Sequence, residues 1–111
     1  MVSGSSPSAV SFGDAHITLD ADSALEMVGS AAQPTALLER GAAWFSVAPR
    51  GDRPAFEVHA GDMIVRVIGT RFRVARDGER ASVTVYHGVV EVRYRGRAMR
   101  LADGQSWSTD R

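Results

Sequence analysis

Apolar and polar residues alternate along most of the chain, most clearly from Met63 to Val74. Side chains of a β-strand point to opposite faces in turn, so this stretch predicts two strand segments, each with an apolar face. Gly69 and Thr70 separate the two segments, and a glycine inside a strand usually marks a bulge, a bend or a close backbone approach. We therefore predict a kinked strand in which Phe72 lies on the apolar face. We also expect the Thr70 hydroxyl to form a hydrogen bond with a backbone group at the break. A ligand contact at Gly69 is the alternative.

Short alternating segments recur along the rest of the chain, bounded by glycine, proline, aspartate or serine. They predict strands at 16–19, 24–28, 42–47, 55–59, 81–86, 89–95 and 98–101. We expect 42–47 and 55–59 to form a hairpin across a turn at 49–54, and His87-Gly88 to be a further turn. No window keeps a helical period for three turns. The prediction is an all-β fold, an antiparallel sandwich or roll of short strands, like a jelly roll or double-stranded β-helix.

Size and composition fit one independently folding domain. The chain has 111 residues, of which 44% are hydrophobic. Residues 1–13 are mostly small and polar, so we assign them to a linker or cloning remnant and 14–111 to the β-domain. There is no cysteine, which excludes disulfides, thiolate metal ligands and a cysteine nucleophile. No apolar run approaches the roughly 18 residues of a membrane span, and no signal-peptide pattern is present.

The formal net charge is zero, but the charges are unevenly distributed. Residues 1–65 hold eight carboxylates against three arginines, whereas 66–111 hold ten arginines against five carboxylates. All the basic residues are arginine, which fits the codon usage of a GC-rich genome. Overall neutrality argues against a dedicated nucleic-acid-binding protein, because such proteins normally carry a strong basic excess.

No set of residues in the sequence points to catalysis. His16, His59 and His87 lie far apart without metal-ligand spacing, and we interpret them as exposed or capping residues. The aspartates near turns are interpreted as hydrogen-bonding local backbone. No glycine-rich phosphate loop precedes a helix. We therefore expect no catalytic residue, no metal and no cofactor, and the chain is not predicted to be an enzyme.

Arginine side chains are the first candidates for contacts with a partner. Two of them share one strand face and two share another, so neighbouring strands would join them into one basic face. Such a face suits an acidic protein, lipid head groups or nucleic acid. The alternative is a solvated face neutralised by Glu91 and Glu79. The four residues are Arg71, Arg73, Arg93 and Arg95.

The two tryptophans are the second candidates, since aromatic residues and arginine dominate protein interfaces. Trp44 lies on the strand face opposite Phe45, and Trp107 lies near the end of the chain. Either tryptophan could be an exposed anchor for a partner. The alternative is that they belong to the core or cover a sheet edge.

Five segments in series resemble the FecR family. Residues 65–74 match its most distinctive element, V-x-V-x-G-T-x-F-x-V. Residues 41–47 resemble G-x-x-x-F-x-V, 53–58 resemble R-P-F-x-V with Ala55 inserted, 83–92 match V-x-V-x-x-G-x-V-x-V, and 101–105 resemble L-x-x-G-Q/E. Residues 16–25 are more weakly similar to the opening of the family pattern. The resemblance covers most of the chain, and it marks Gly69, Thr70, Phe72 and Gly88 as structural motif residues.

The resemblance implies a regulatory role without chemistry. Members are mostly bacterial sigma-factor regulators with a cytoplasmic anti-sigma region, one membrane helix and this β-rich domain in the periplasm. Many carry a further C-terminal domain that contacts the signalling domain of a TonB-dependent outer-membrane transporter. We therefore expect a periplasmic module, excised from an inner-membrane protein, that relays transporter status, often that of an iron-chelate transporter, by protein contact.

The membrane would be reached only through a helix outside this segment, and nucleic acid is not an expected partner. The alternative function is a cell-envelope module that binds a glycan or an acidic ligand through the tryptophans and arginines.

Overall fold

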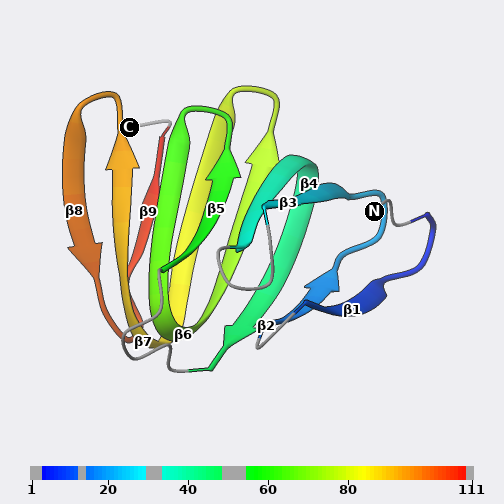
Figure 1. Ribbon diagram of the computed structural model, residues 1–111. Coiled ribbons are helices and arrows are strands. Elements are labelled where there is room, and N and C mark those ends of the chain that lie inside the picture. Colours follow the sequence, from blue (N-terminus) through cyan, green and yellow to red (C-terminus); the bar gives the residue numbers. More distant parts are fainter. Residues whose placement is uncertain (1–3, 13–14, 30–33, 49–54, 110–111) are drawn as a thin grey trace.

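The computed structural model describes residues 4–12, 15–29, 34–48 and 55–109, and these form an all-β fold without a helix, as predicted (Figure 1). The strands of the described residues are β1 (Ser8–Phe12), β2 (Ala15–Leu19), β3 (Ala24–Gly29), β4 (Pro34–Val47), β5 (Phe56–Ala60), β6 (Met63–Asp77), β7 (Arg80–Tyr94), β8 (Arg97–Leu101) and β9 (Ser106–Ser108). Each strand segment predicted from the sequence lies mostly within one of these strands.

Three long strands, β4, β6 and β7, form the body of the fold, and each changes partners near its middle. Strand β6 pairs with β5 through residues 63–67 and with β4 through residues 70–76. Strand β7 pairs with β9 through 82–84 and with β8 through 90–94. The long strands curve around the interior in Figure 1. The sheet is thereby folded into two layers, which gives the predicted sandwich or roll from strands of 14 to 15 residues.

The first layer contains β1, β2, β9, the C-terminal halves of β4 and β6 and the N-terminal half of β7. The second layer contains β3, β5, β8 and the other halves of the three long strands. The inward-facing side chains of both layers form one hydrophobic cluster. Each strand therefore has one buried face and one outer face.

Three phenylalanines lie at the centre of the core. The Phe45 and Phe72 rings stack with centroids 4.9 Å apart, and Phe45 meets Phe56 at 6.0 Å. All three side chains are buried, and burying each one contributes about 1.5–3 kcal/mol. Buried and exposed positions alternate along the strands, so a shift of one residue in register would move the core side chains to the surface.

The predicted kink at Gly69 is a β-bulge at the corner between the layers. The register between β6 and β7 shifts there, so that two residues of β6 lie opposite the single residue Val89. Gly88 has a φ of 101°, and a Cβ on it would lie 2.6 Å from the Gly69 carbonyl oxygen. The buried Thr70 hydroxyl donates a 2.9 Å hydrogen bond to the Val89 carbonyl. The close approach therefore requires glycine at position 88. Thr70 supplies a hydrogen-bond donor to the Val89 carbonyl at the bulge, as predicted.

The predicted hairpin between 42–47 and 55–59 is wrong. Strand β5 pairs in parallel with residues 35–37 of β4, whereas 42–47 pair with β2 and β6. The sequence placed a strand boundary at Gly41, but the strand continues through it with a bend at φ 85°. A Cβ on Gly41 would lie 2.7 Å from Ser23 Cα, so only glycine fits this bend. The predicted turn at 49–54 lies outside the described residues.

Two further expectations differ from the structure. Ser8–Phe12, assigned from the sequence to a linker, form β1 and pair with β2 in antiparallel fashion. The serine-rich composition concealed an alternation in which Val10 packs against the core. At His87-Gly88 the chain does not turn, because β7 runs through both residues and passes from one layer to the other.

Candidate functional site

The outer surface of the first layer carries exposed aromatic, basic and hydroxyl side chains from β2, β4, β6 and β7. Two cross-strand rows run over it, set by the pairing of β2 with β4, β4 with β6 and β6 with β7. The first row is Thr18, Trp44, Arg73 and Thr84, and the second is His16, Ser46, Arg71 and His87. We call these eight residues and Tyr86 the aromatic–arginine face.

Trp44 and Tyr86 form a stacked pair on this face. Their ring centroids lie 5.1 Å apart with an interplanar angle of 26°, and the side chains remain 41% and 50% exposed. The Arg73 guanidinium lies 5.4 Å from the centroid of the Trp44 ring. It also donates a 2.7 Å hydrogen bond to Asp20. Arg73 is therefore held in place under the tryptophan, and the aromatic pair is held in an exposed, ordered arrangement.

A second bulge explains how His87 reaches this face next to Tyr86. Arg71 pairs with His87, whereas Phe72 pairs with Val85, so Tyr86 is the extra residue of β7. Consecutive residues of a regular strand point to opposite faces, but Tyr86 and His87 are both exposed. The bulge thus adds a side chain to the face, as bulges near functional sites often do.

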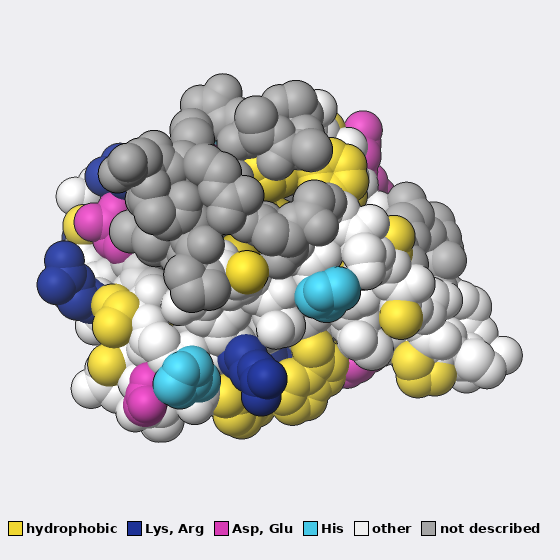
Figure 2. Space-filling view, turned by 60° about the horizontal axis from the view of Figure 1, so that its bottom comes forward, with side chains coloured by type: hydrophobic (Ala, Val, Ile, Leu, Met, Phe, Trp, Pro, Cys, Tyr) yellow, Lys and Arg dark blue, Asp and Glu magenta, His cyan; other side chains and the backbone are white. Residues whose placement is uncertain are grey.

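Arg71 lies between two adjoining hollows of about 340 and 470 Å³. His16, Ser46 and Arg71 line both of them, and the smaller one also has Trp44 and Tyr86 in its wall. Among the described residues, no carboxylate forms an ion pair with Arg71. Figure 2 shows a face of the protein on which histidine and arginine side chains lie beside hydrophobic ones. Arg71 thus has no counter-charge among the described residues and lies next to an apolar surface.

The outer surface of the second layer is organised differently. Register pairs Glu57 with Arg66, Arg66 with Glu91 and Glu91 with Arg100, so charges alternate across four strands. Arg66 lies 3.3 Å from Glu57 and 3.6 Å from Glu91, and Arg93 donates a 2.9 Å hydrogen bond to Glu91. We call these five residues the charge ladder. Its arginines are largely compensated by neighbouring carboxylates.

The four candidate arginines do not form one basic face. Arg71 and Arg73 lie on the first layer, whereas Arg93 and Arg95 follow the corner of β7 and belong to the second. Glu91 neutralises Arg93, as the alternative reading of the sequence expected. The Arg95 Nε lies 3.4 Å from Asp62, and its guanidinium lies over the Tyr94 ring at 5.1 Å. The change of layer within β6 and β7 separates the two pairs.

The two tryptophans are also separated. Trp107 on β9 pairs with the buried Val83, is half-buried and packs against the core. Its ring meets Tyr94 with centroids 5.3 Å apart. Trp107 therefore covers an end of the core, whereas Trp44 is exposed on the outer face. The sequence reasoning did not include Tyr86 or the two histidines in the site. Tyr86 follows the alternation of Val83 and Val85, whereas His87 is exposed by a bulge that leaves no mark in the pattern.

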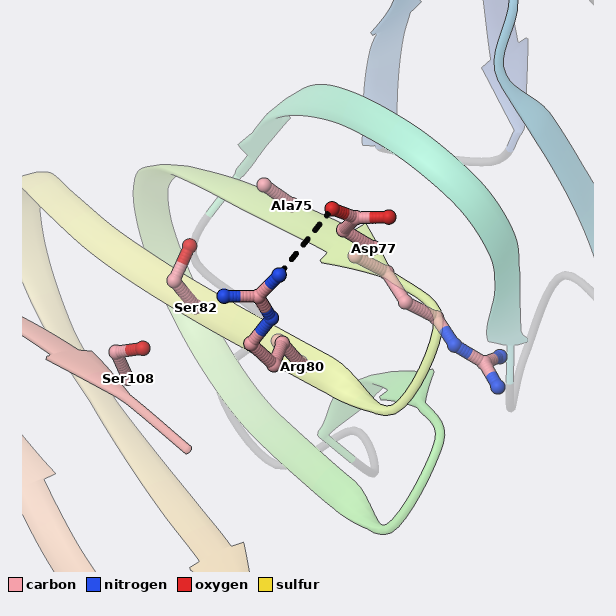
Figure 3. Close-up of a pocket in the computed structure, with 7 residues that line it drawn as sticks. Ala75, Asp77, Arg80, Ser82 and Ser108 are labelled. Atoms are coloured by element: carbon pink, nitrogen blue, oxygen red, sulfur yellow. Dashed lines mark ion pairs between the residues drawn. The ribbon is translucent and has the colours of Figure 1, made fainter. Parts of the chain in front are cut away.

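A pocket of about 270 Å³ lies where the β6–β7 hairpin meets β9 (Figure 3). Two of its three charged residues, Arg80 and Asp77, face each other at 3.9 Å and are highly exposed. Ser82 and Ser108 line the opposite side. No histidine lines this pocket, so its serines are not paired with a histidine that could act as a base. Within the described part of the chain, no group of three or more His, Asp or Glu side chains could hold a metal ion. That part also contains no helix suited to crossing a bilayer.

Comparison with known proteins gives a consistent result. The model of the FecR protein family matches residues 3–91. Two crystal structures of a candidate anti-sigma factor from Parabacteroides distasonis, at 1.65 and 2.50 Å resolution, superpose with TM-scores of 0.81 and 0.78 at 23% sequence identity. Each comparison covers 97% of this chain and 57% of the other, so the chain spans little more than half of those proteins. No curated protein sequence matches the chain.

Proposed function

The chain belongs to the FecR family and is a regulatory signalling module, and we propose that it works in the periplasm as the sensor part of a transmembrane sigma-factor regulator. In this role it relays the status of an outer-membrane transporter, of the iron-chelate type, to the rest of the regulator. It does so by protein–protein contact and carries out no reaction itself. Its partners are other regions of the same regulator and the signalling domain of a TonB-dependent transporter.

The aromatic–arginine face is the observation that supports contact as the mode of action. Tryptophan, tyrosine and arginine are the residues that dominate binding energy at protein interfaces. Here Trp44 and Tyr86 are exposed yet ordered by stacking, and Arg71 beside them has no ion-pair partner among the described residues. The family's motif residues have a structural role instead: Gly69, Thr70 and Gly88 form the bulge between the layers, and Phe72 is buried in the core. The surface suited to a partner is thus distinct from the scaffold that supports it.

The experiment uses the full-length regulator in its bacterium, with a reporter gene driven by the cognate sigma factor. We expect the Trp44→Ala/Tyr86→Ala variant to abolish the reporter's response to the transporter's iron chelate. Arg93→Gln, on the charge ladder, is the control and should respond normally. Melting of the purified variants establishes that both are folded. A normal response of the folded double variant contradicts the proposal. The periplasmic location is tested separately: if added protease does not cleave the module after the outer membrane is removed, that location is contradicted.

A second function, binding of a cell-envelope glycan, is favoured by the same stacked pair, because exposed aromatic rings also stack on sugars. NMR titration separates the two functions. Shifts of the Trp44 indole signal on addition of envelope polysaccharide, with none on addition of the transporter's signalling domain, would replace the signalling role by glycan binding. The proposed function requires the opposite result.

A further inference from the structure

We infer that the aromatic–arginine face binds an extended, carboxylate-rich segment of a protein partner, with Arg71 as the anchor of a carboxylate. This inference rests on the proposed function, since it states the chemistry of the partner that the module contacts. It concerns the second cross-strand row and the hollow next to it.

The charges on the face are complementary to an anion. The row from β2 to β7 presents His16, Ser46, Arg71 and His87, all of which can donate hydrogen bonds. Two carboxylates of the described residues contact this face, Asp20 and Asp103, and both are already engaged. Asp20 accepts from Arg73 at 2.7 Å.

Asp103, the second of these carboxylates, lies at the opposite end of the row. Its Oδ1 accepts the Gly88 N–H at 2.6 Å, and its Oδ2 lies 3.9 Å from the His87 Nδ1. Neither Asp20 nor Asp103 forms an ion pair with Arg71, so the guanidinium remains available to a carboxylate from outside. A guanidinium can hold a carboxylate through two parallel hydrogen bonds, which fixes the ligand's orientation as well as its charge.

The hollow beside Arg71 adds an apolar contact. Trp44, Phe45, Phe72 and Tyr86 contribute to its wall, and its volume is about 340 Å³. An aliphatic or aromatic side chain of the bound segment can cover this wall while a neighbouring carboxylate reaches Arg71. The site therefore suits a segment in which acidic residues stand next to an apolar one.

The length of the row favours an extended peptide. Three strand intervals separate β2 from β7, which is roughly 14 Å at about 4.8 Å per interval. About four or five residues of extended chain cover this distance. Nucleic acid would need several phosphate contacts along its backbone, whereas this row holds a single arginine, Arg71. A neutral glycan can accept hydrogen bonds from Arg71 but supplies no counter-charge to it.

The test uses the 111-residue chain, labelled with ¹⁵N, and a synthetic probe. The probe is an acetylated decapeptide in which glutamate alternates with serine around a central leucine, and its matched control carries glutamine for glutamate. We expect the acidic peptide to shift the amide signals of Arg71 and His87 and the Trp44 indole signal. Binding should weaken at least tenfold with the glutamine peptide or with Arg71→Gln. It should also weaken as salt is added, and Arg93→Gln should bind like the unmodified chain.

Equal affinity of the two peptides, or of the Arg71→Gln variant and the unmodified chain, would overturn the inference. So would a uronate oligosaccharide that displaces the peptide at an equal or lower concentration, since the site would then take an anionic glycan. The assay contains neither transporter nor sigma factor. If the chain binds the acidic peptide but the Trp44→Ala/Tyr86→Ala regulator still gives a normal reporter response, the signalling role alone is contradicted. If the double variant loses the response but the chain does not bind the acidic peptide, the role of Arg71 as anchor alone is contradicted.

Discussion

The two outer faces of the sandwich both carry arginine, and they use it in opposite ways. On the charge ladder Arg66 and Arg93 lie within reach of a carboxylate on the same or a neighbouring strand. On the aromatic–arginine face Arg73 is paired, whereas Arg71 has no ion pair within the described residues and lies beside exposed rings. The number of arginines therefore says little about where a partner binds. What distinguishes the faces is that Arg66 and Arg93 have a carboxylate within the protein, whereas Arg71 has none among the described residues.

The difference has a physical origin in strand register. Exposed ion pairs contribute only about 0–1 kcal/mol each, so the ladder is not required for folding. It does supply Arg66 with counter-charges, because Glu57 and Glu91 lie directly across from it. Across from Arg71 lie Ser46 and His87 instead. On the charge ladder Arg66 is thus paired within the protein, whereas on the aromatic–arginine face Arg71 is available to an anion from a partner.

The largest effect is expected from Phe72→Ala, which removes the ring that supports the open face from beneath. The side chain is buried and stacks on Phe45. Loss of such a ring costs about 3–5 kcal/mol in unfolding free energy. Urea denaturation should show this loss, with Val89→Ala as an exposed control that changes stability by less than about 0.5 kcal/mol. A small effect at Phe72 would mean that the two layers do not share one core.

Gly88→Ala tests the corner that joins the two faces. The new Cβ would meet the Gly69 carbonyl oxygen at 2.6 Å, and φ is positive. Gly78 is a matched control, because its φ is also positive but nothing lies within 4 Å of the Cβ position. We expect Gly78→Ala to cost about 1 kcal/mol from the backbone alone and Gly88→Ala about 3 kcal/mol. Equal shifts of the two urea midpoints would contradict the close approach at the corner.

Glu91→Gln opens the charge ladder at its centre. Glu91 contacts both Arg66 and Arg93, so its neutralisation leaves two arginines without this partner. We expect a loss of about 1 kcal/mol at low salt that shrinks as the ionic strength approaches about 1 M. Glu79→Gln, in the exposed β6–β7 turn, should leave stability unchanged. A loss that salt does not reduce would indicate that packing, and not charge, holds this face.

The sequence contained the fold class and the exact place of the main corner, because alternation and an interior glycine follow directly from strand geometry. It assigned Trp44 to the strand face opposite Phe45 for the same reason. The parallel pairing of β5 with β4 was not predictable in this way, since it depends on Gly41 bending a strand without ending it. A glycine that bends a strand and one that ends it have the same local pattern.

The candidate site was predicted only in part. Trp44, Arg71 and Arg73 were selected as residue types, and they lie together on one face. Arg93, Arg95 and Trp107 were selected on the same grounds, but the change of layer in β7 and the packing of β9 place them elsewhere. Tyr86 lies on this face by simple alternation with Val83 and Val85, and it was missed because only the tryptophans were selected among the aromatic residues. His87 was not predictable, because a bulge of one residue changes the face of a side chain without changing the composition around it.

The smallest effect on stability, and the sharpest distinction between the faces, is expected from comparing Arg71→Gln with Arg66→Gln. Arg66 lies between two carboxylates, so its loss leaves Glu57 and Glu91 facing each other across β6 and costs about 1 kcal/mol. Arg71 has no ion pair with any described residue, so stability of Arg71→Gln should stay within about 0.5 kcal/mol of the unmodified chain. Binding of the acidic peptide should show the reverse order, with Arg71→Gln impaired and Arg66→Gln normal. Equal losses of stability and equal binding of the acidic peptide in the two variants would contradict this difference between the faces. Arg71 would then have the same structural role as the ion-paired Arg66.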